Sequence, residues 1–170
     1  MVLGNINIHA QNPDFLFMVE YAIKAPSEHN TQPWLFRINE NSIEIHPNFD
    51  RALPVVDFDN RELFISLGCA LENLCITALE KGYDYDVELT KTGIITVYLS
   101  SPDTSGYNSL FQQIPLRQTN RSIYNGKQIP EENIAELREV INDENINIRF
   151  YKHGTPEFDA IRNYIEQGNR

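Results

Sequence analysis

The first apolar pattern along the chain changes from helical to strand-like spacing. Apolar side chains recur every three or four positions in residues 14–25, which predicts a helix capped by Asn12 or Asp14. Residues 34–38 and 43–46 instead alternate apolar and polar side chains on either side of a polar turn. This alternation predicts a β-hairpin directly after the helix.

The most apolar segment is residues 61–81. Its stripe is wide enough to predict a long helix that is buried on most of its sides, and we take this helix as the structural centre of the fold. Asp59 or Asn60 can cap its first turn, and Gly82 stands where a C-terminal cap belongs.

A second hairpin and a polar linker follow this helix. Residues 83–89 and 94–99 alternate around a turn that contains glycine, which predicts two more strands. Together with the helices, the two hairpins predict an α+β fold in which an antiparallel or mixed sheet packs on the long central helix. The polar residues 101–106 are the best candidate for a boundary within the chain.

The last third of the chain has three further elements. Residues 130–142 predict an amphipathic helix, residues 146–151 a strand, and residues 155–167 a final helix. We therefore divide the chain at the polar linker, into residues 1–105 and residues 106–170.

Composition and charge exclude several classes of protein. The chain has 170 residues, of which 41% are apolar and 22% charged, which suits a globular domain with a real core. Its net charge of −10 argues against a nucleic-acid partner. The first residues do not have the pattern of a signal peptide, and no apolar run approaches the ~20 residues of a membrane span. Cys69 and Cys75 are poorly spaced for a disulfide, and we expect buried, reduced thiols in a cytoplasmic protein.

A polar loop joins the first helix to the first strand. Residues 25–34 read Ala-Pro-Ser-Glu-His-Asn-Thr-Gln-Pro-Trp. Loops between regular elements often hold ligands. The same residues also suit a plain connection, because Pro26 ends a helix and Pro33 precedes extended chain. Residue chemistry leaves both interpretations open, and we expect Trp34 in the core.

A basic stretch interrupts this acidic chain. Residues 104–130 contain no Asp or Glu, although the whole chain has 24 of them, and they include Arg117 and Arg121. Two guanidinium groups with the Thr119 hydroxyl between them suit a phosphate group. The alternative is that both arginines are solvated or pair with acids elsewhere in the fold.

Together, the loop and the basic stretch resemble the nitroreductase-like family of FMN-dependent proteins. In that family a P-S-x-x-N-x-Q-P-W loop joins a helix to a strand, and residues 26–34 match it at every fixed position. The family's arm for the flavin phosphate reads R-x-S/T-x-R/K, with an aromatic residue soon after. The residues that match this arm are Arg117, Thr119, Arg121 and Tyr124. An Ile-Pro-Glu-Glu helix start at residues 129–132 follows, and the resemblance covers most of residues 15–137.

The order of the motifs resembles one branch of the family. In simple members the arginine arm precedes the loop, whereas here it follows the loop. That order is similar to the Acg-type proteins, which fuse two nitroreductase-like repeats. The resemblance implies a first repeat and the start of a truncated second one, so later parts of the family's flavin site have no counterpart here.

The resemblance also assigns roles to residues. Those that would hold the FMN phosphate are Arg117, Thr119 and Arg121. Those that would hold or brace the flavin ring, together with free backbone N–H groups of the loop, are Pro26, Ser27, Asn30 and Gln32. No catalytic acid or base is expected, and the histidines lack the spacing of metal ligands.

Two interpretations of function follow from the resemblance. The first is an oxidoreductase that moves electrons from NAD(P)H through FMN to a nitro compound or a quinone. The alternative is a flavin-binding or flavin-sequestering protein, or a truncated remnant, without turnover. The expected partners are a small-molecule electron acceptor and either a second copy of the chain or a missing C-terminal half. No nucleic-acid or membrane partner is expected.

Overall fold

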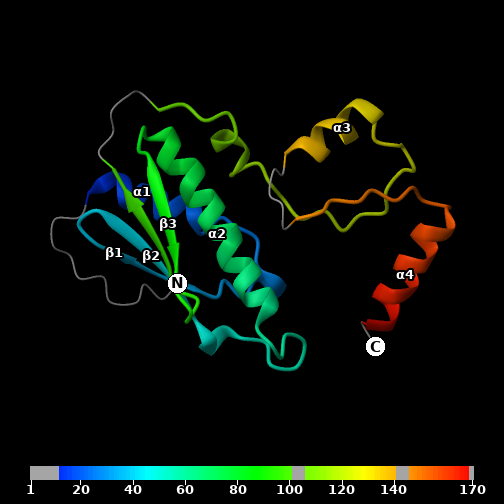
Figure 1. Ribbon diagram of the computed structural model, residues 1–170, viewed down its shortest axis with the longest axis horizontal. Helices are drawn as coiled ribbons and strands as arrows, with labels where there is room; N and C mark the ends of the chain where they lie inside the picture. The colour runs from blue at the N-terminus through cyan, green and yellow to red at the C-terminus, as the bar shows by residue number, and fades with distance from the viewer. Residues whose placement is uncertain (1–11, 101–105, 141–145, 169–170) are drawn as a thin grey trace. The chain divides into compact units, whose positions relative to one another are not determined.

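An antiparallel sheet of four strands organises the first part of the chain (Figure 1). In sequence order its strands are β1 (Trp34–Ile38), β2 (Ser42–Pro47), β3 (Tyr85–Leu89) and β4 (Ile95–Leu99). The strand order in the sheet is β1-β2-β4-β3, so the two predicted hairpins are confirmed and meet through β2 and β4. The computed structural model describes residues 12–100, 106–140 and 146–168.

One face of this sheet forms the core. Ile43 and Ile45 of β2 lie opposite apolar residues of β4 and are fully buried. The helices α1 (Pro13–Ala22) and α2 (Arg61–Glu80) pack on each other and cover this face, with α2 against β2 and α1 against β1. The described residues of the first unit therefore form an α+β fold, in which the sheet is one layer and α1 and α2 are the other.

The helix α1 differs slightly from its prediction at both ends. Asn12 rather than Asp14 caps it, because the Asn12 side-chain oxygen accepts the Asp14 N–H at 3.0 Å. The helix ends at Ala22, before the predicted end at Ala25. The Ala25 N–H bonds to the Ala22 carbonyl three positions back, which tightens the last turn. Ala25 also precedes Pro26, and the residue before a proline is disfavoured from the helical conformation.

Asp57 caps the helix α2. Its buried carboxylate accepts the N–H groups of Glu62 at 3.0 Å and Leu63 at 2.9 Å. Asn60 sits at the cap position in the left-handed conformation without a side-chain capping bond, and Asp59 accepts one longer bond of 3.3 Å. The prediction that Asp59 or Asn60 caps α2 is therefore wrong about the main cap, because Asp57 accepts two of the helix N–H groups and Asp59 only one. The loop before α2 folds back and brings an earlier acid to the free N–H groups.

Replacing Asp57 by Ala is expected to lower the free energy of unfolding by about 1–2 kcal/mol, because two helix N–H groups lose their acceptor. The matched control is Asp59→Ala, which removes one long, exposed bond and should cost about 0.5 kcal/mol or less. Urea unfolding followed by circular dichroism measures both changes. Equal losses in the two variants would show that Asp57 is not the main cap.

Two glycines shape the other end of α2. Gly82 has a φ of +80°, and its N–H bonds to the Leu79 carbonyl while the Tyr83 N–H bonds to the Ala78 carbonyl. This confirms the predicted C-terminal cap. A Cβ atom on Gly106 would lie 2.3 Å from the Leu79 carbonyl oxygen, so the chain passes this helix end at a distance that only glycine allows.

By length and composition alone, α2 is also apolar enough to cross a membrane. No uninterrupted apolar run in the sequence is this long, but α2 reaches the composition with polar residues interspersed. Half of the apolar window is buried inside the fold, where α2 packs against α1 and the sheet. The core helix of a globular domain can have the same length and composition, so these two properties are weak evidence for a membrane span.

The chain divides into two compact units, residues 1–120 and residues 121–170. In the second unit, the helices α3 (Glu131–Glu139) and α4 (Pro156–Gly168) agree with the prediction, and the Thr155 hydroxyl caps α4 by accepting the Phe158 N–H at 3.3 Å. The predicted strand at residues 146–151 is wrong, since none of these residues forms a strand. The boundary between two sequence repeats stays a prediction.

Candidate functional site

The loop between α1 and β1 holds three residues in the left-handed conformation. His29, Asn30 and Gln32 have φ angles of 46°, 57° and 51°. Asn adopts this conformation readily, whereas His and Gln do so at a cost of roughly 1–2 kcal/mol each. Contacts elsewhere in the loop must therefore stabilise this backbone shape.

Hydrogen bonds close the loop on itself and on α2. The Ser27 Oγ accepts the Gln32 N–H at 2.9 Å, and the Thr31 N–H donates to the Glu28 carbonyl at 2.9 Å. The Glu28 N–H donates to the Ser66 Oγ of α2 at 3.3 Å. With the Asn30 N–H bonded to the Ser27 carbonyl, the N–H groups of residues 28, 30, 31 and 32 all have acceptors. The expectation of free backbone N–H groups is wrong for these four.

The loop instead offers side chains to a ligand. Pro26, Asn30 and Gln32 are exposed, and within the described part of the chain the two amides have no hydrogen-bond partner. Ser27 is half-buried, and its hydroxyl can still donate its own proton while it accepts the Gln32 N–H. Trp34 is 7% exposed and belongs to the core, as predicted.

Replacing Gln32 by Gly is expected to raise the free energy of unfolding by about 0.5–1 kcal/mol, because glycine adopts the left-handed conformation without strain. If the Gln32 amide helps to hold a ligand, the same change weakens binding, so stability and affinity move in opposite directions. Gln113→Gly is the control, because Gln113 is exposed but lies in an ordinary 3₁₀ turn. Urea unfolding compares the two, and a loss of stability in both would contradict a strained loop.

Arg51 lies outside the motif at residues 26–34 but bonds to the same loop. Its Nη1 donates to the Thr31 carbonyl at 2.8 Å, and the neighbouring Asn48 N–H bonds to the Pro33 carbonyl at 2.9 Å. These two bonds hold the segment after β2 against the loop and bring a positive charge to it. No sequence signal marked Arg51, because it lies in an irregular stretch without hydrophobic periodicity.

Glu28 occupies a variable position of the motif but carries an unusual atom. Its Oε2 is buried and has no hydrogen-bond partner among the described residues. Its Oε1 lies 3.9 Å from the Nε2 of His29. A buried acceptor without a donor is costly, so this oxygen is one of the unfavourable contacts that the rest of the loop must offset.

The segment just before the basic arm packs on the helix that anchors the loop. Burial raises the pKa of the Cys69 thiol on α2, and the positive charge of Arg117 lowers it in part. Ser66, which accepts the Glu28 N–H, is one helical turn before Cys69. The short 3₁₀ helix η3 (Phe111–Gln113) packs on α2, and the Arg117 N–H bonds to the Gln113 carbonyl at its end. The loop and the segment just before the basic arm, far apart in the sequence, thus both contact α2.

The other two residues of the arm are exposed. Thr119 belongs to the first compact unit, and Arg121 begins the second. The joint role of the three arm residues stays a prediction.

The two cysteines are free thiols, but only Cys75 is buried as predicted, because Cys69 is half-buried. Burial and the nearby Glu72 carboxylate raise the pKa of the Cys75 thiol to about 12, although a hydrogen bond with Tyr85 opposes this. Cys75 therefore stays protonated near neutral pH and is a poor nucleophile. Among the residues that the structure describes, no group of three or more His, Cys, Asp or Glu side chains could hold a metal ion.

Comparison with known proteins gives two informative relatives, both from Mycobacterium tuberculosis. One, from strain H37Rv, is named "Putative NAD(P)H nitroreductase Rv3131"; it is 33% identical over 121 residues, which cover 67% of this chain and 35% of the relative. Another, from the same strain, is named "Putative NAD(P)H nitroreductase acg" and is 28% identical over 110 residues, covering 61% of this chain and 33% of the relative. No protein family model matches the chain.

These relatives support a nitroreductase-like family for the chain. The α+β architecture, with its antiparallel sheet, is consistent with that fold. The chain spans about a third of the length of the relatives that it matches.

Proposed function

We propose that this chain binds FMN as part of a nitroreductase-like oxidoreductase. The electrons would pass from NAD(P)H through FMN to a nitro compound or a quinone. One observation carries the proposal. The loop at residues 26–34 is bonded to α2 through the Glu28 N–H and the Ser66 hydroxyl, and the short 3₁₀ helix η3 (Phe111–Gln113), to which the Arg117 N–H is bonded, packs on the same helix.

The chemistry of these residues fits FMN. The amides of Asn30 and Gln32 can both donate and accept hydrogen bonds, as the polar edge of a flavin ring requires. The unpaired Glu28 Oε2 can accept one ring N–H, and Arg51 brings a positive charge to the same loop. FMN, when bound, supplies the redox chemistry, while the protein binds and orients it.

The remaining predicted residues have supporting roles. Ser27 donates its hydroxyl proton to the ring edge, and Pro26 gives the loop its shape on the exposed side. Arg117, Thr119 and Arg121 bind the phosphate through charge-assisted and neutral hydrogen bonds. No side chain of the chain is assigned as a catalytic acid or base.

Mixing the purified chain with FMN tests the proposal directly. Saturable quenching of flavin fluorescence is expected, followed by bleaching of the flavin absorbance when NADH or NADPH is added without oxygen. The absence of quenching would refute FMN binding. Bound flavin that neither nicotinamide bleaches would leave binding intact and favour the flavin-sequestering alternative.

The relatives' names favour electron transfer over sequestration, because both are named nitroreductases. We further propose a cytoplasmic protein that completes its flavin site with a second copy of the chain or with a C-terminal half. Analytical ultracentrifugation with and without FMN tests the first of these options, and a monomer that binds FMN at one full equivalent would contradict both.

A further inference from the structure

The strand β3 leaves one edge of the sheet free. It pairs with β4 and, among the described residues, with no other strand. The residues at either end of β3 direct their backbone groups to the β4 side. The Asp84 carbonyl accepts the Ser100 N–H at 3.0 Å, and the Thr90 N–H donates to the Ile94 carbonyl at 2.9 Å. Bonding alternates along an antiparallel strand, so residues 85, 87 and 89 direct their backbone N–H and C=O groups away from β4.

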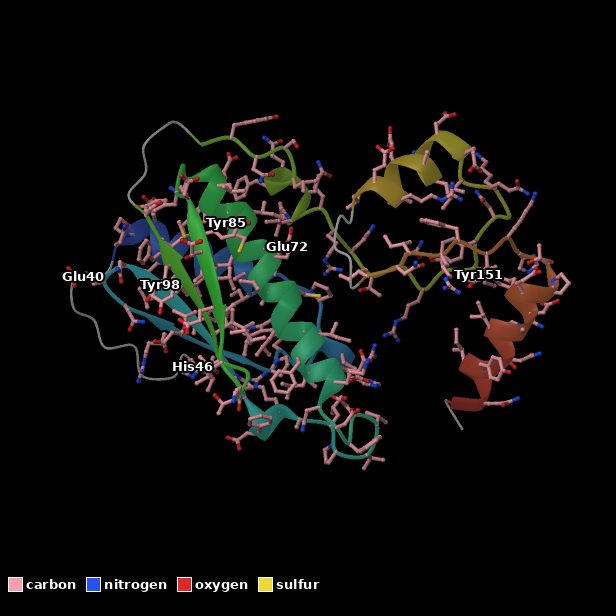
Figure 2. The ribbon with its side chains drawn as sticks, in the orientation of Figure 1. Glu40, His46, Glu72, Tyr85, Tyr98 and Tyr151 are labelled. Atoms are coloured by element: carbon pink, nitrogen blue, oxygen red, sulfur yellow. The ribbon has the colours of Figure 1, made fainter. Side chains whose placement is uncertain are left out.

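The helices cover the apolar side chains of β3 only in part, at Tyr85. Tyr85, Val87 and Leu89 lie opposite buried residues of β4, on the face of the sheet that forms the core. They are nevertheless 38%, 44% and 69% exposed. Figure 2 shows Tyr85 near Glu72 of α2, which marks where the helix layer reaches β3. The core face therefore continues beyond the helices as an uncovered apolar strip.

The other face of β3 is acidic. Asp86 and Glu88 point to this side, and the exposed Tyr98 of β4 donates its hydroxyl to the Glu88 Oε2 at 3.1 Å (Figure 2). A groove of about 630 Å³ surrounds the start of the strand. It is lined by Leu79, Asp84, Tyr85, Asp86, Tyr98, Leu99 and Ser100. Apolar walls with two carboxylates and two tyrosine rings suit the apolar stem and charged head of Arg or Lys.

A second copy of β3 is a poor partner for this edge. The antiparallel register centred on Val87 would pair all five residues of the strand and would set Asp86 opposite Glu88 at two positions. Like charges directly opposite each other destabilise a strand pair. Acids on an edge strand therefore oppose pairing with like-charged copies and favour a cationic strand.

We propose that the free edge of β3 is a docking surface for an extended segment of a partner protein whose side chains alternate between apolar and cationic. The added strand pairs with the backbone groups of residues 85, 87 and 89. Its apolar side chains extend the core over Val87 and Leu89, and its cationic side chains lie beside Asp86 and Glu88. This is recognition by strand addition, in which the backbone gives affinity and the alternate side chains give specificity.

The test uses the full chain and a short fluorescent peptide that alternates valine and arginine, with fluorescence anisotropy as the readout. Saturable binding is expected, and it should weaken as salt is added. Asp86→Lys combined with Glu88→Lys should weaken binding about 10-fold or more, and should allow a valine–glutamate peptide to bind instead. Both positions are exposed, and circular dichroism checks that the variant is folded.

A backbone-methylated version of the same peptide separates strand addition from simple charge attraction. Methyl groups on alternate backbone nitrogens remove the donors that face β3 while the side chains stay unchanged. Loss of binding by the methylated peptide supports the proposal. Equal binding by both peptides, or no saturable binding by the unmethylated one, overturns it.

Discussion

Alanine at both Arg117 and Arg121 is expected to weaken FMN binding by on the order of 100-fold. A charge-assisted hydrogen bond to a phosphate contributes about 1.5–3 kcal/mol, and the exposure of these side chains favours the lower end of that range. Two such bonds at the lower end correspond to about two powers of ten in the dissociation constant. Titration of flavin fluorescence at fixed ionic strength measures the change.

A second double variant controls for the loss of positive charge. Arg138→Ala with Arg162→Ala removes the same two charges from exposed ion pairs of the second unit. FMN affinity should change little in this variant. Unchanged affinity in the first variant, or an equal loss in both, would refute the assignment of the phosphate arm.

Leu67→Ala is expected to lower the free energy of unfolding by about 2–5 kcal/mol. Leu67 lies on α2, is completely buried and belongs to the cluster formed by α1, α2 and the sheet. Truncation removes buried methyl groups and leaves a cavity that the surrounding helices and strands fill only in part. Urea unfolding should show a lower midpoint with an unchanged slope.

Leu79→Ala is the matched comparison, because Leu79 is on the same helix but is 37% exposed. Its loss should be about 1 kcal/mol or less, since exposed truncations leave no cavity. Similar losses in the two variants would mean that the packing of α2 on the sheet contributes little to stability.

Elements with a local sequence signal were predictable. The alternation in β1, β2, β3 and β4, together with the turn residues between them, is sufficient to locate both hairpins. The same holds for Gly82 and Thr155, whose roles at helix ends depend only on nearby backbone. The alternation of residues 146–151 predicted a strand that is absent, because a strand also needs a partner and alternation alone does not supply one.

Features that depend on the path of a loop were not predictable. Asp57 caps α2 because the chain folds back before the helix, and no residue spacing indicates that. The motif at residues 26–34 identified the polar side chains of the loop, but not that its N–H groups are already bonded. The bond from Arg51 to the Thr31 carbonyl and the unpaired oxygen of Glu28 likewise depend on how the loop folds, which no residue spacing indicates.

The left-handed residues of that loop have a consequence for how a ligand would be received. Ser27, Arg51 and Ser66 already fix the backbone through bonds from three directions. A ligand that docks on Asn30 and Gln32 therefore has little chain to order, and most of the entropy of shaping the site is lost when the protein folds. The loop is preorganised. The unfavourable backbone conformation of His29 and Gln32 is offset when the protein folds, so it does not reduce the free energy of ligand binding.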